Sequence, residues 1–588
     1  MSAAYGLAGV VLVVTATVLI GTLGLRISRT TSDFYVASRT VTPLRNASAI
    51  GGEYLSAASF LGIAGLILAY GADMLWLPAG WTGGYLVLLV LVSAPLRRSG
   101  AYTLADFAEA RLESMAVRRV TSVLVVLIGW LYLLPQFQSA GLVLRTVAGA
   151  PAWAGGVLIA VVVAAAVLAG GMRSITMVQA FQYWLKLTAL AVPLIFLALA
   201  WRFDGSPGLD RDMPPRFTER TTVSIGLAVT VQVTAPVTVT VDGRVDGREY
   251  GGGREYGGGR PHDGGALTLD PGPHRFEQDT AVTFPKGADV PHVDGTAAVT
   301  DREWGMPLTG REHSLYATYS LILATFLGTM GLPHVLVRFY TNPDGRAARR
   351  TTVLVLSLLG AFYLLPSLYG ALGRLYTPEL LMTGRADAVV LTLPGRVIGG
   401  LGGDLLGALV TGGAVAAFLS TSSGITVSVA GVLGQDILRG GVRSFRVATL
   451  LALTVPLALS VAARSLAVAD VVGLAFAVAA STFCPLLVLG IWWRRLTVAG
   501  ALAGLVTGGT LAGAAVVVTI AAGPPGGLAG ALLAQPAAWT VPIAFAVMIV
   551  VSWCTPGRIP PGVARMMVRL HAPESLDVDR GTWRPKRV

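Results

Sequence analysis

The sequence predicts an all-α polytopic membrane protein with about thirteen membrane-spanning helices. Of its 588 residues, 54% are hydrophobic and only 13% are charged, and the mean hydropathy is +0.67. A water-soluble globule could not cover so much apolar surface with polar side chains, so the surrounding solvent is lipid. A helix needs roughly 20 apolar residues to cross a hydrocarbon layer of about 30 Å. Runs of this kind lie near residues 5–26, 44–70, 75–96, 119–148, 152–171, 174–201, 313–337, 351–373, 400–432, 446–463, 466–491, 497–522 and 535–554.

The distribution of basic residues predicts an N-out, C-in orientation. With the N-terminus outside, the loops on one side carry nineteen arginines, and the tail after Cys554 adds seven basic residues on that same side. The short loops of the opposite side hold only Arg145, Arg374, Arg385, Arg396 and Arg464. The positive-inside rule places the more basic side in the cytoplasm, which requires an odd number of crossings.

Five segments follow from these runs. Residues 1–202 contain helices 1 to 6, 313–491 contain helices 7 to 11, 492–554 contain helices 12 and 13, and 555–588 form a basic cytoplasmic tail. Residues 203–312 are polar and form an extracellular insertion, partly β or flexible. Between Val229 and Val241, valine alternates with Thr, Gln or Ala up to a turn signal at Asp242-Gly243, whereas the repeat REYGGG at 248–259 is low-complexity. We expect a small β-hairpin on a loose loop.

Several classes of function are excluded by what the sequence lacks. No G-x-x-x-x-G-K-[ST] motif occurs, and the tail is too short for a nucleotide-binding domain, so a primary pump is not expected. Cys484 and Cys554 and the scattered histidines offer no metal-ligand spacing. The basic residues follow membrane topology and form no contiguous face for nucleic acid. We expect neither an enzyme nor a nucleic-acid-binding protein, and no protein partner is evident.

Two predicted helices are interrupted, and they lie five helices apart. Helix 2 contains Gly51-Gly52-Glu53 within an apolar span, and helix 7 contains Gly328-Thr329-Met330-Gly331-Leu332-Pro333. Interruptions at equivalent places in two halves indicate inverted repeats with unwound helices at a midplane binding site. Helices 2–6 and 7–11 would be these repeats. The alternative is that the glycines only permit close helix packing.

Helix 9 carries a polar stripe. Ala417, Ser420, Thr421, Gly424 and Ser428 are spaced to share one helical face. Sodium prefers several oxygen ligands, which side-chain hydroxyls and the carbonyls of an unwound turn can supply inside a membrane. Alternatively, these hydroxyls bond to their own backbone or to a neighbouring helix.

Other polar residues within the spans have open roles. Glu53 either supports the unwound turn, binds a proton, or lies near enough to the interface to stay hydrated. Tyr132 and Gln136 share a face beside Pro135 and either bind a small solute or join helices. Lys186, about a dozen residues into helix 6, either snorkels or pairs internally.

Five stretches resemble the sodium/solute symporter family, and within it the cation/acetate symporters. They are GEYLSAASFLG at 52–62, TLADF at 103–107, residues 170–172 with Val178-Gln179, LGTMGLPHVLVRFY at 327–340, and AFLSTSSGITVSVAGVLGQD at 417–436. The resemblance implies a LeuT-like fold and a sodium ion as coupling ion. Carried over by position, the sodium ligands would be the carbonyls of Gly52, Leu55 and Ala417 and the hydroxyls of Ser420 and Thr421. Substrate-binding candidates are Ser56, Ser59, Tyr132, Gln136 and Thr329.

These observations lead to a hypothesis of sodium-coupled symport of acetate or a similar short monocarboxylate by alternating access in a bacterial-type cell membrane. The partners would be the monocarboxylate and membrane lipid. A proton-coupled carrier using Glu53, a symporter for proline, a sugar or pantothenate, and a transporter-like membrane sensor remain as alternatives. No arginine is placed by the sequence to clamp an anion, and residues 203–312 have no counterpart in the compact members of the family.

Overall fold

The computed structural model describes residues 3–25, 41–208, 212–226, 228–251, 265–293, 300–308, 313–438, 441–462, 468–523 and 525–572. Some residues used in the sequence analysis lie outside these ranges: Arg26, Arg29, Arg39, Arg439, Arg464, most of the glycine-rich repeat and the last sixteen residues of the tail.

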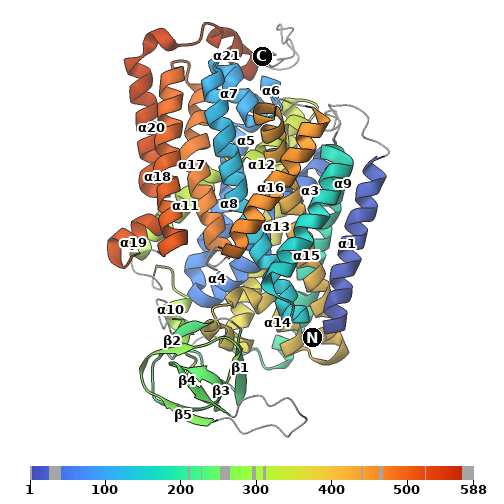
Figure 1. Cartoon of the computed structure of the whole chain (residues 1–588), viewed down its shortest axis with the longest axis vertical. Helices are drawn as coiled ribbons and strands as arrows, with labels where there is room; N and C mark the ends of the chain where they lie inside the picture. The colour runs from blue at the N-terminus through green and yellow to red at the C-terminus, as the bar shows by residue number, and fades with distance from the viewer. Residues whose placement is uncertain are drawn as a thin grey trace.

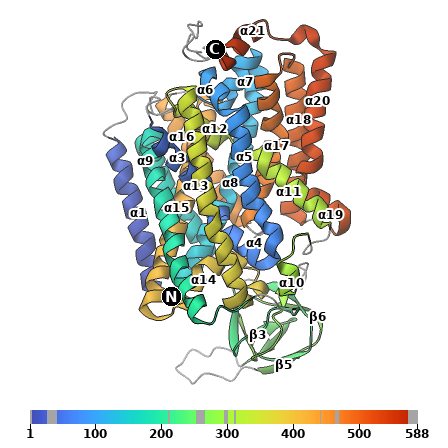
Figure 2. The ribbon, with the colours of Figure 1, turned by 180° about the vertical axis from the view of Figure 1, so that it is seen from behind.

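Helices form a bundle with a β-domain at one end (Figures 1 and 2). α1 begins at the β-domain end, and α21 lies at the opposite end, as an odd number of crossings requires. The long bundle helices are α1 (Ala3–Leu25), α5 (Trp76–Leu91), α8 (Met115–Ala148), α9 (Ala152–Phe203), α13 (Gly345–Tyr376), α15 (Gly400–Val432), α16 (Val442–Ala462), α17 (Val468–Trp492), α18 (Val498–Ala522) and α20 (Ala537–Cys554). Shorter helices are α6 (Ser93–Ser99), α7 (Leu104–Leu112), α14 (Val389–Val397), α19 (Gly527–Ala534) and α21 (Val563–His571).

Eleven helical stretches of the described residues are long and apolar enough to cross a membrane. The difference from thirteen has two sources. Ala58–Leu91 counts as one stretch, although Gly71, with φ +68°, separates two helices within it. Ala152–Leu168, the first half of α9, is apolar but short. The multi-pass architecture is therefore confirmed, while the count of thirteen and the N-out orientation stay predictions.

Both predicted interruptions are present. Helix 2 consists of α3 (Pro43–Tyr54), a non-helical step at Leu55 and Ser56, a π-helical turn (Ala58–Gly62) and α4 (Ile63–Tyr70). Helix 7 consists of α11 (Ser314–Thr329), a break, and the short α12 (Pro333–Val337). Proline at the first position of α12 fits a restarted helix because that position needs no N–H donor.

The described residues of the insertion form eight antiparallel strands. They are β1 (Thr221–Ile225), β2 (Val229–Val233), β3 (Val237–Val245), β4 (Arg248–Tyr250), β5 (Gly265–Leu269), β6 (Gly272–Phe276), β7 (Thr280–Phe284) and β8 (His292–Val293). The sheet order is β1-β7-β3-β6-β2-β8, with β4 and β5 also paired to β3. Val231, Val241, Phe276 and Phe284 are among the side chains of a separate apolar core.

The expected single hairpin on a loose loop is therefore wrong in scale, although the β content is confirmed. Val229–Val241 does form strands, but Pro236 falls between β2 and β3, where its missing N–H costs no ladder bond. The remaining strands are mostly about five residues long and mix Thr with small apolar residues. Their alternation of apolar and polar side chains is therefore too short to recognise in the sequence. In β1 the side chains nevertheless alternate strictly between buried and exposed.

The insertion is attached firmly to the bundle. The short helix α10 (Asp301–Trp304) places the Trp304 indole N–H 2.7 Å from the carbonyl of Ile67, at the end of α4. Arg374 of α13 forms an ion pair of 2.9 Å with Asp301. Met382, from the turn (Pro378–Met382) between α13 and α14, is fully buried in the core of the β-domain. The end of α4 is thus held from two sides.

A buried ion cluster ties together the opposite end of the bundle. Arg118, at the start of α8, pairs with Asp106 of α7 at 2.9 Å, with Glu109 of α7 at 2.5 Å, and with Asp436 at 2.6 Å. Asp436 lies in the π-helical turn (Leu433–Ile437) that follows α15. Asp106 also accepts backbone N–H groups in a capping box with Thr103. The cluster joins α7, α8 and the end of α15.

Asp106 should make stability depend on pH. Burial raises the pKa of this carboxyl from 3.8 to about 6, against the opposing effect of Arg118. A carboxyl whose pKa is higher in the folded state stabilises that state at pH values below its pKa in the unfolded state. This stabilisation is lost as the pH rises through the folded-state pKa, so the free energy of unfolding should change between about pH 4 and 6. We expect the Tm of Asp106→Asn to rise relative to wild type across this window, by the equivalent of roughly 1 to 3 kcal/mol. Thermal unfolding in detergent, with the exposed Asp212→Asn as control, checks this; parallel curves for all three proteins would contradict it.

The orientation can be tested by cysteine labelling. Cys484 and Cys554 are free and would first be replaced by alanine. With the predicted topology, Glu249→Cys in the β-domain should react with a membrane-impermeant maleimide in intact cells, whereas Arg565→Cys in α21 should react only after permeabilisation. Both side chains are exposed, so burial does not explain a difference. The reverse labelling pattern would overturn the N-out prediction.

Candidate ion and substrate site

The break in helix 2 exposes carbonyl groups inside the bundle. Gly52 fits there because a Cβ would lie 2.2 Å from the carbonyl oxygen of Gln179 on α9. The restarted helix is held by Gln136 of α8, whose Oε1 accepts the N–H of Ala57 at 3.1 Å. Close packing at the glycines and unwinding just after them therefore occur together, while the inverted repeats and the midplane site stay predictions.

The polar stripe of α15 faces this break. Ser420 Oγ donates to the Gly52 carbonyl at 2.6 Å, and Thr421 Oγ1 donates to the Glu53 carbonyl at 2.6 Å. Ser420 Oγ also lies 3.1 Å from the carbonyl of Ala417. Gly424 leaves room for the Glu53 carboxylate, since a Cβ there would lie 2.1 Å from its carbon. The hydroxyls of Ser420 and Thr421 therefore form hydrogen bonds with helix 2, and the Ser420 hydroxyl also bonds to the backbone of α15.

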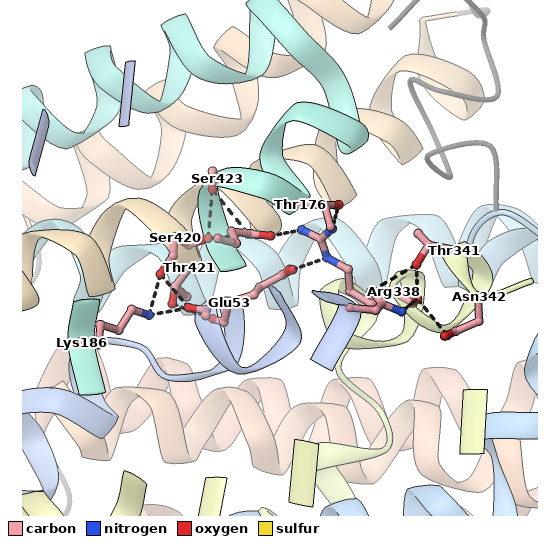
Figure 3. Close-up of polar contacts among 12 residues, drawn as sticks. Glu53, Thr176, Lys186, Arg338, Thr341, Asn342, Ser420, Thr421 and Ser423 are labelled. Atoms are coloured by element: carbon pink, nitrogen blue, oxygen red, sulfur yellow. Dashed lines mark hydrogen bonds and ion pairs between the residues drawn. The ribbon is translucent and has the colours of Figure 1, made fainter. Parts of the chain in front are cut away.

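The amine of Lys186 lies between the two elements (Figure 3). Its Nζ donates to the carbonyl of Leu55 at 2.7 Å, to Ser420 Oγ at 2.7 Å, and to the carbonyl of Gly52. The side chain is fully buried, so the snorkelling alternative is wrong and internal pairing is correct. Three of the five predicted sodium ligands thus contact the nitrogen of Lys186.

Glu53 forms a buried ion pair with Arg338, which follows α12. Their contact is 2.7 Å, and both side chains are 1% exposed, so a hydrated position for Glu53 is wrong. Arg338 also donates to Thr176 Oγ1 at 2.7 Å and to Gln179 Oε1, while Gln179 Nε2 donates to the Ser420 carbonyl at 2.8 Å (Figure 3). One network therefore connects both broken helices to α9 and α15.

The substrate-binding candidates lie around the two breaks but have different surroundings. Thr329 Oγ1 is 2.9 Å from the Tyr54 hydroxyl, and Ser59 Oγ is 3.2 Å from that of Tyr363. Ser56 lies in the helix-2 break itself and is fully buried. Gln136 is committed to the backbone of helix 2, so its contact is structural.

Aromatic rings line the same region. Tyr132 lies edge-on to His334, with 5.1 Å between ring centroids, and 6.0 Å from Phe476 of α17. Trp81 of α5 lies 5.6 Å from the Phe476 ring. Among the described residues, the buried ring nitrogens of Trp81 and His334 and the Tyr85 hydroxyl have no hydrogen-bond partner. Buried polar atoms without partners are uncommon in folded proteins, and here they lie beside the breaks.

Sequence reasoning missed Arg338, Gln179, Thr176 and His334 as members of this site. A signal was present for three of them, because Val178-Gln179 and the stretch containing His334 and Arg338 belong to the segments that carry the family resemblance. Arg338 is one of the nineteen arginines that the positive-inside pattern places in loops, and nothing in its local sequence indicates that it turns inward toward Glu53.

The model of the sodium:solute symporter family matches residues 34–201 and 310–508. The chain belongs to this family. The unmatched segment between the two ranges corresponds to the insertion. An uncharacterised symporter of Bacillus subtilis (YwcA) is 29% identical over 507 residues, covering 84% of this chain and 82% of the relative. A monocarboxylic acid transporter of Corynebacterium glutamicum is 29% identical over 521 residues, covering 85% of this chain and 80% of the relative.

The fold is also found among solved structures. The outward-open, substrate-bound structure of a Na⁺-coupled sialic acid symporter superposes with a TM-score of 0.61 at 14% identity, over 94% of this chain and 97% of the other. The LeuT-like fold class is thereby confirmed. The chain is a multi-pass membrane transporter rather than an enzyme, and family membership supports sodium-coupled symport as its general activity.

The contact between Gly424 and Glu53 can be tested by one methyl group. In Gly424→Ala, the new Cβ must displace the Glu53 carboxylate from Arg338, because it would lie 2.1 Å from the carboxylate carbon. We expect destabilisation by about 1 to 3 kcal/mol, the usual cost of overpacking a core. The matched control is Gly513→Ala in α18, where a Cβ meets no atom within 4 Å. Equal Tm values for both variants in detergent would sink this account.

Proposed function

We propose that this protein is a secondary active symporter for acetate or a similar short monocarboxylate, working by alternating access. The solute moves together with a cation that runs down its own gradient. The broken helices 2 and 7 form the binding site, and the solute and the cation both stabilise one conformation of the protein. Family membership supports sodium as the coupling ion.

The proposal of a monocarboxylate as the solute is supported by the buried polar groups beside the breaks in helices 2 and 7. A short monocarboxylate has one charged group and a small apolar body. The ring nitrogens of Trp81 and His334 and the Tyr85 hydroxyl could bind its oxygens, and the rings of Tyr132 and Phe476 could contact its methyl group. Ser56, Ser59 and Thr329 would add hydroxyls. The name of the Corynebacterium relative agrees with this class.

A second candidate, proton-coupled symport, is favoured by one specific contact. Lys186 Nζ lies against the oxygens of Gly52, Leu55 and Ser420, which were expected to bind sodium. Glu53, the residue expected to carry a proton in such a carrier, is paired with Arg338 instead.

Uptake into proteoliposomes tests the solute class. We expect labelled acetate to enter proteoliposomes faster than protein-free liposomes at equal internal and external pH, with pyruvate and propionate competing and proline not competing. Ser56→Ala should lower this uptake by roughly tenfold, as expected when a hydroxyl to a charged ligand is lost. Competition by proline or a sugar, with none by propionate, would replace the monocarboxylate by another solute.

A further inference from the structure

Lys186 is unusual in this sequence by residue type and by place. Of the 44 basic residues only three are lysines, and the other two, Lys286 and Lys586, lie in the insertion and the tail. Lys186 is the one within the predicted spans, and its side chain is fully buried between α3 and α15. A buried amine in a membrane is costly, so its presence needs a compensating arrangement.

That arrangement satisfies the ammonium completely. An ammonium group has three N–H donors. They reach the carbonyls of Gly52 and Leu55 and the hydroxyl oxygen of Ser420, the last two at 2.7 Å each. Ser420 Oγ in turn directs its own hydrogen to the Gly52 carbonyl at 2.6 Å. A sodium ion would need the same oxygens and would meet a like charge at contact distance, so the two cations exclude one another.

Among the described side chains, few other charged groups face Lys186. From α3, Glu53 interacts with it electrostatically, but that carboxylate is paired with Arg338. The ion pair of Glu53 and Arg338 is neutral overall, so it supplies no net charge opposite Lys186. On the helices packed against α9, the other charged side chains lie near helix ends, and the remaining titratable groups are tyrosines. They are Tyr5 on α1, Arg45 and Tyr54 on α3, Arg118, Arg119, Tyr132 and Arg145 on α8, Arg346, Arg349, Arg350, Tyr363, Tyr369, Arg374 and Tyr376 on α13, Arg396 on α14, Asp404 on α15, and Arg443 and Arg446 on α16.

We propose that Lys186 is the resident cation of the site between helices 2 and 9, and that the proton it carries is the ion transported with the solute. This inference rests on the proposed symport. The ammonium binds Gly52, Leu55 and Ser420 and holds the break in helix 2. On the inward side it releases one proton to water and becomes a neutral amine, and it is protonated again from the outer solution.

Lysine fits this role better than arginine, because a lysine side chain can release its proton inside a protein. Arginine stays charged under all physiological conditions. A neutral amine keeps fewer donors for the three oxygens, so its loss of charge weakens the contact between α3 and α15. Movement of the broken helix is thereby linked to the protonation state.

Sodium binding to the purified protein tests the inference without any solute. In wild type we expect no ²²Na⁺ binding that depends on Ser420, so that wild type and Ser420→Ala bind equally. Lys186→Met removes the ammonium, and we expect it to gain saturable ²²Na⁺ binding that the double variant with Ser420→Ala loses. Lys286→Met, on the exposed surface of the β-domain, is the matched control and should behave as wild type. Ser420-dependent sodium binding by wild type would overturn the proposal.

Transport provides the second readout. Pyruvate is the better probe under a pH gradient, because as a stronger acid it crosses bare lipid more slowly than acetate. An acidic exterior without sodium should raise pyruvate uptake at least tenfold over uniform pH, and Lys186→Met should lose this stimulation while Lys286→Met keeps it. Stimulation by a sodium gradient alone would overturn proton coupling.

The two proposals can fail separately. If no monocarboxylate is taken up under any gradient, the proposed solute is wrong, and the sodium-binding measurement still decides the role of Lys186. If uptake occurs and follows sodium, the solute class stands and the inference about Lys186 falls. Should Lys186→Met not fold, as judged by gel filtration, the comparison of wild type with Ser420→Ala alone gives the answer.

Discussion

A helix that unwinds inside a membrane releases carbonyl groups that lipid cannot satisfy, and much of the site is arranged around this constraint. The break at Leu55 and Ser56 leaves carbonyls that receive hydrogen bonds from Lys186, Ser420 and Thr421, while the N–H of Ala57 is bonded by Gln136. The donors come from α9 and α15, and the acceptor for Ala57 comes from α8. The broken segment is therefore the point at which three helices are held together by polar contacts.

The second connection runs between the two broken helices. Glu53 at the end of α3 and Arg338 after α12 form an ion pair with almost no solvent exposure. Removing one partner of such a pair leaves an uncompensated buried charge, which typically costs about 3 to 5 kcal/mol. Arg338 also reaches Thr176 on α9, and Gln179 links it to α15. These contacts connect the two breaks to each other and to the helices that carry Lys186 and Ser420.

Sequence could predict the features that follow from local pattern. Apolar runs placed α15 at 400–432 as observed, glycine and proline marked both breaks, and helical spacing put Ser420, Thr421 and Gly424 on one face. What it could not predict was pairing across long separations, since Glu53 and Arg338 are 285 residues apart and Lys186 is 234 residues from Ser420. The β-domain was underestimated because short Thr-rich strands give little periodic signal, although together they bury a core of their own.

The Trp304 indole, which caps the carbonyls of Ile67 and Leu68, gives the insertion a mechanical role. Further along α4, Gly65 lies so close to Asp387 that a Cβ would be 2.4 Å from its carboxylate, and Met382 of the same connection is embedded in the sheet. The half of helix 2 that forms α4 is thus held by the insertion and by a connection whose Met382 is buried in the β-domain core. We expect any rocking of that half-helix to move the sheet with it, so that a load placed on the sheet would reach the unwound turn.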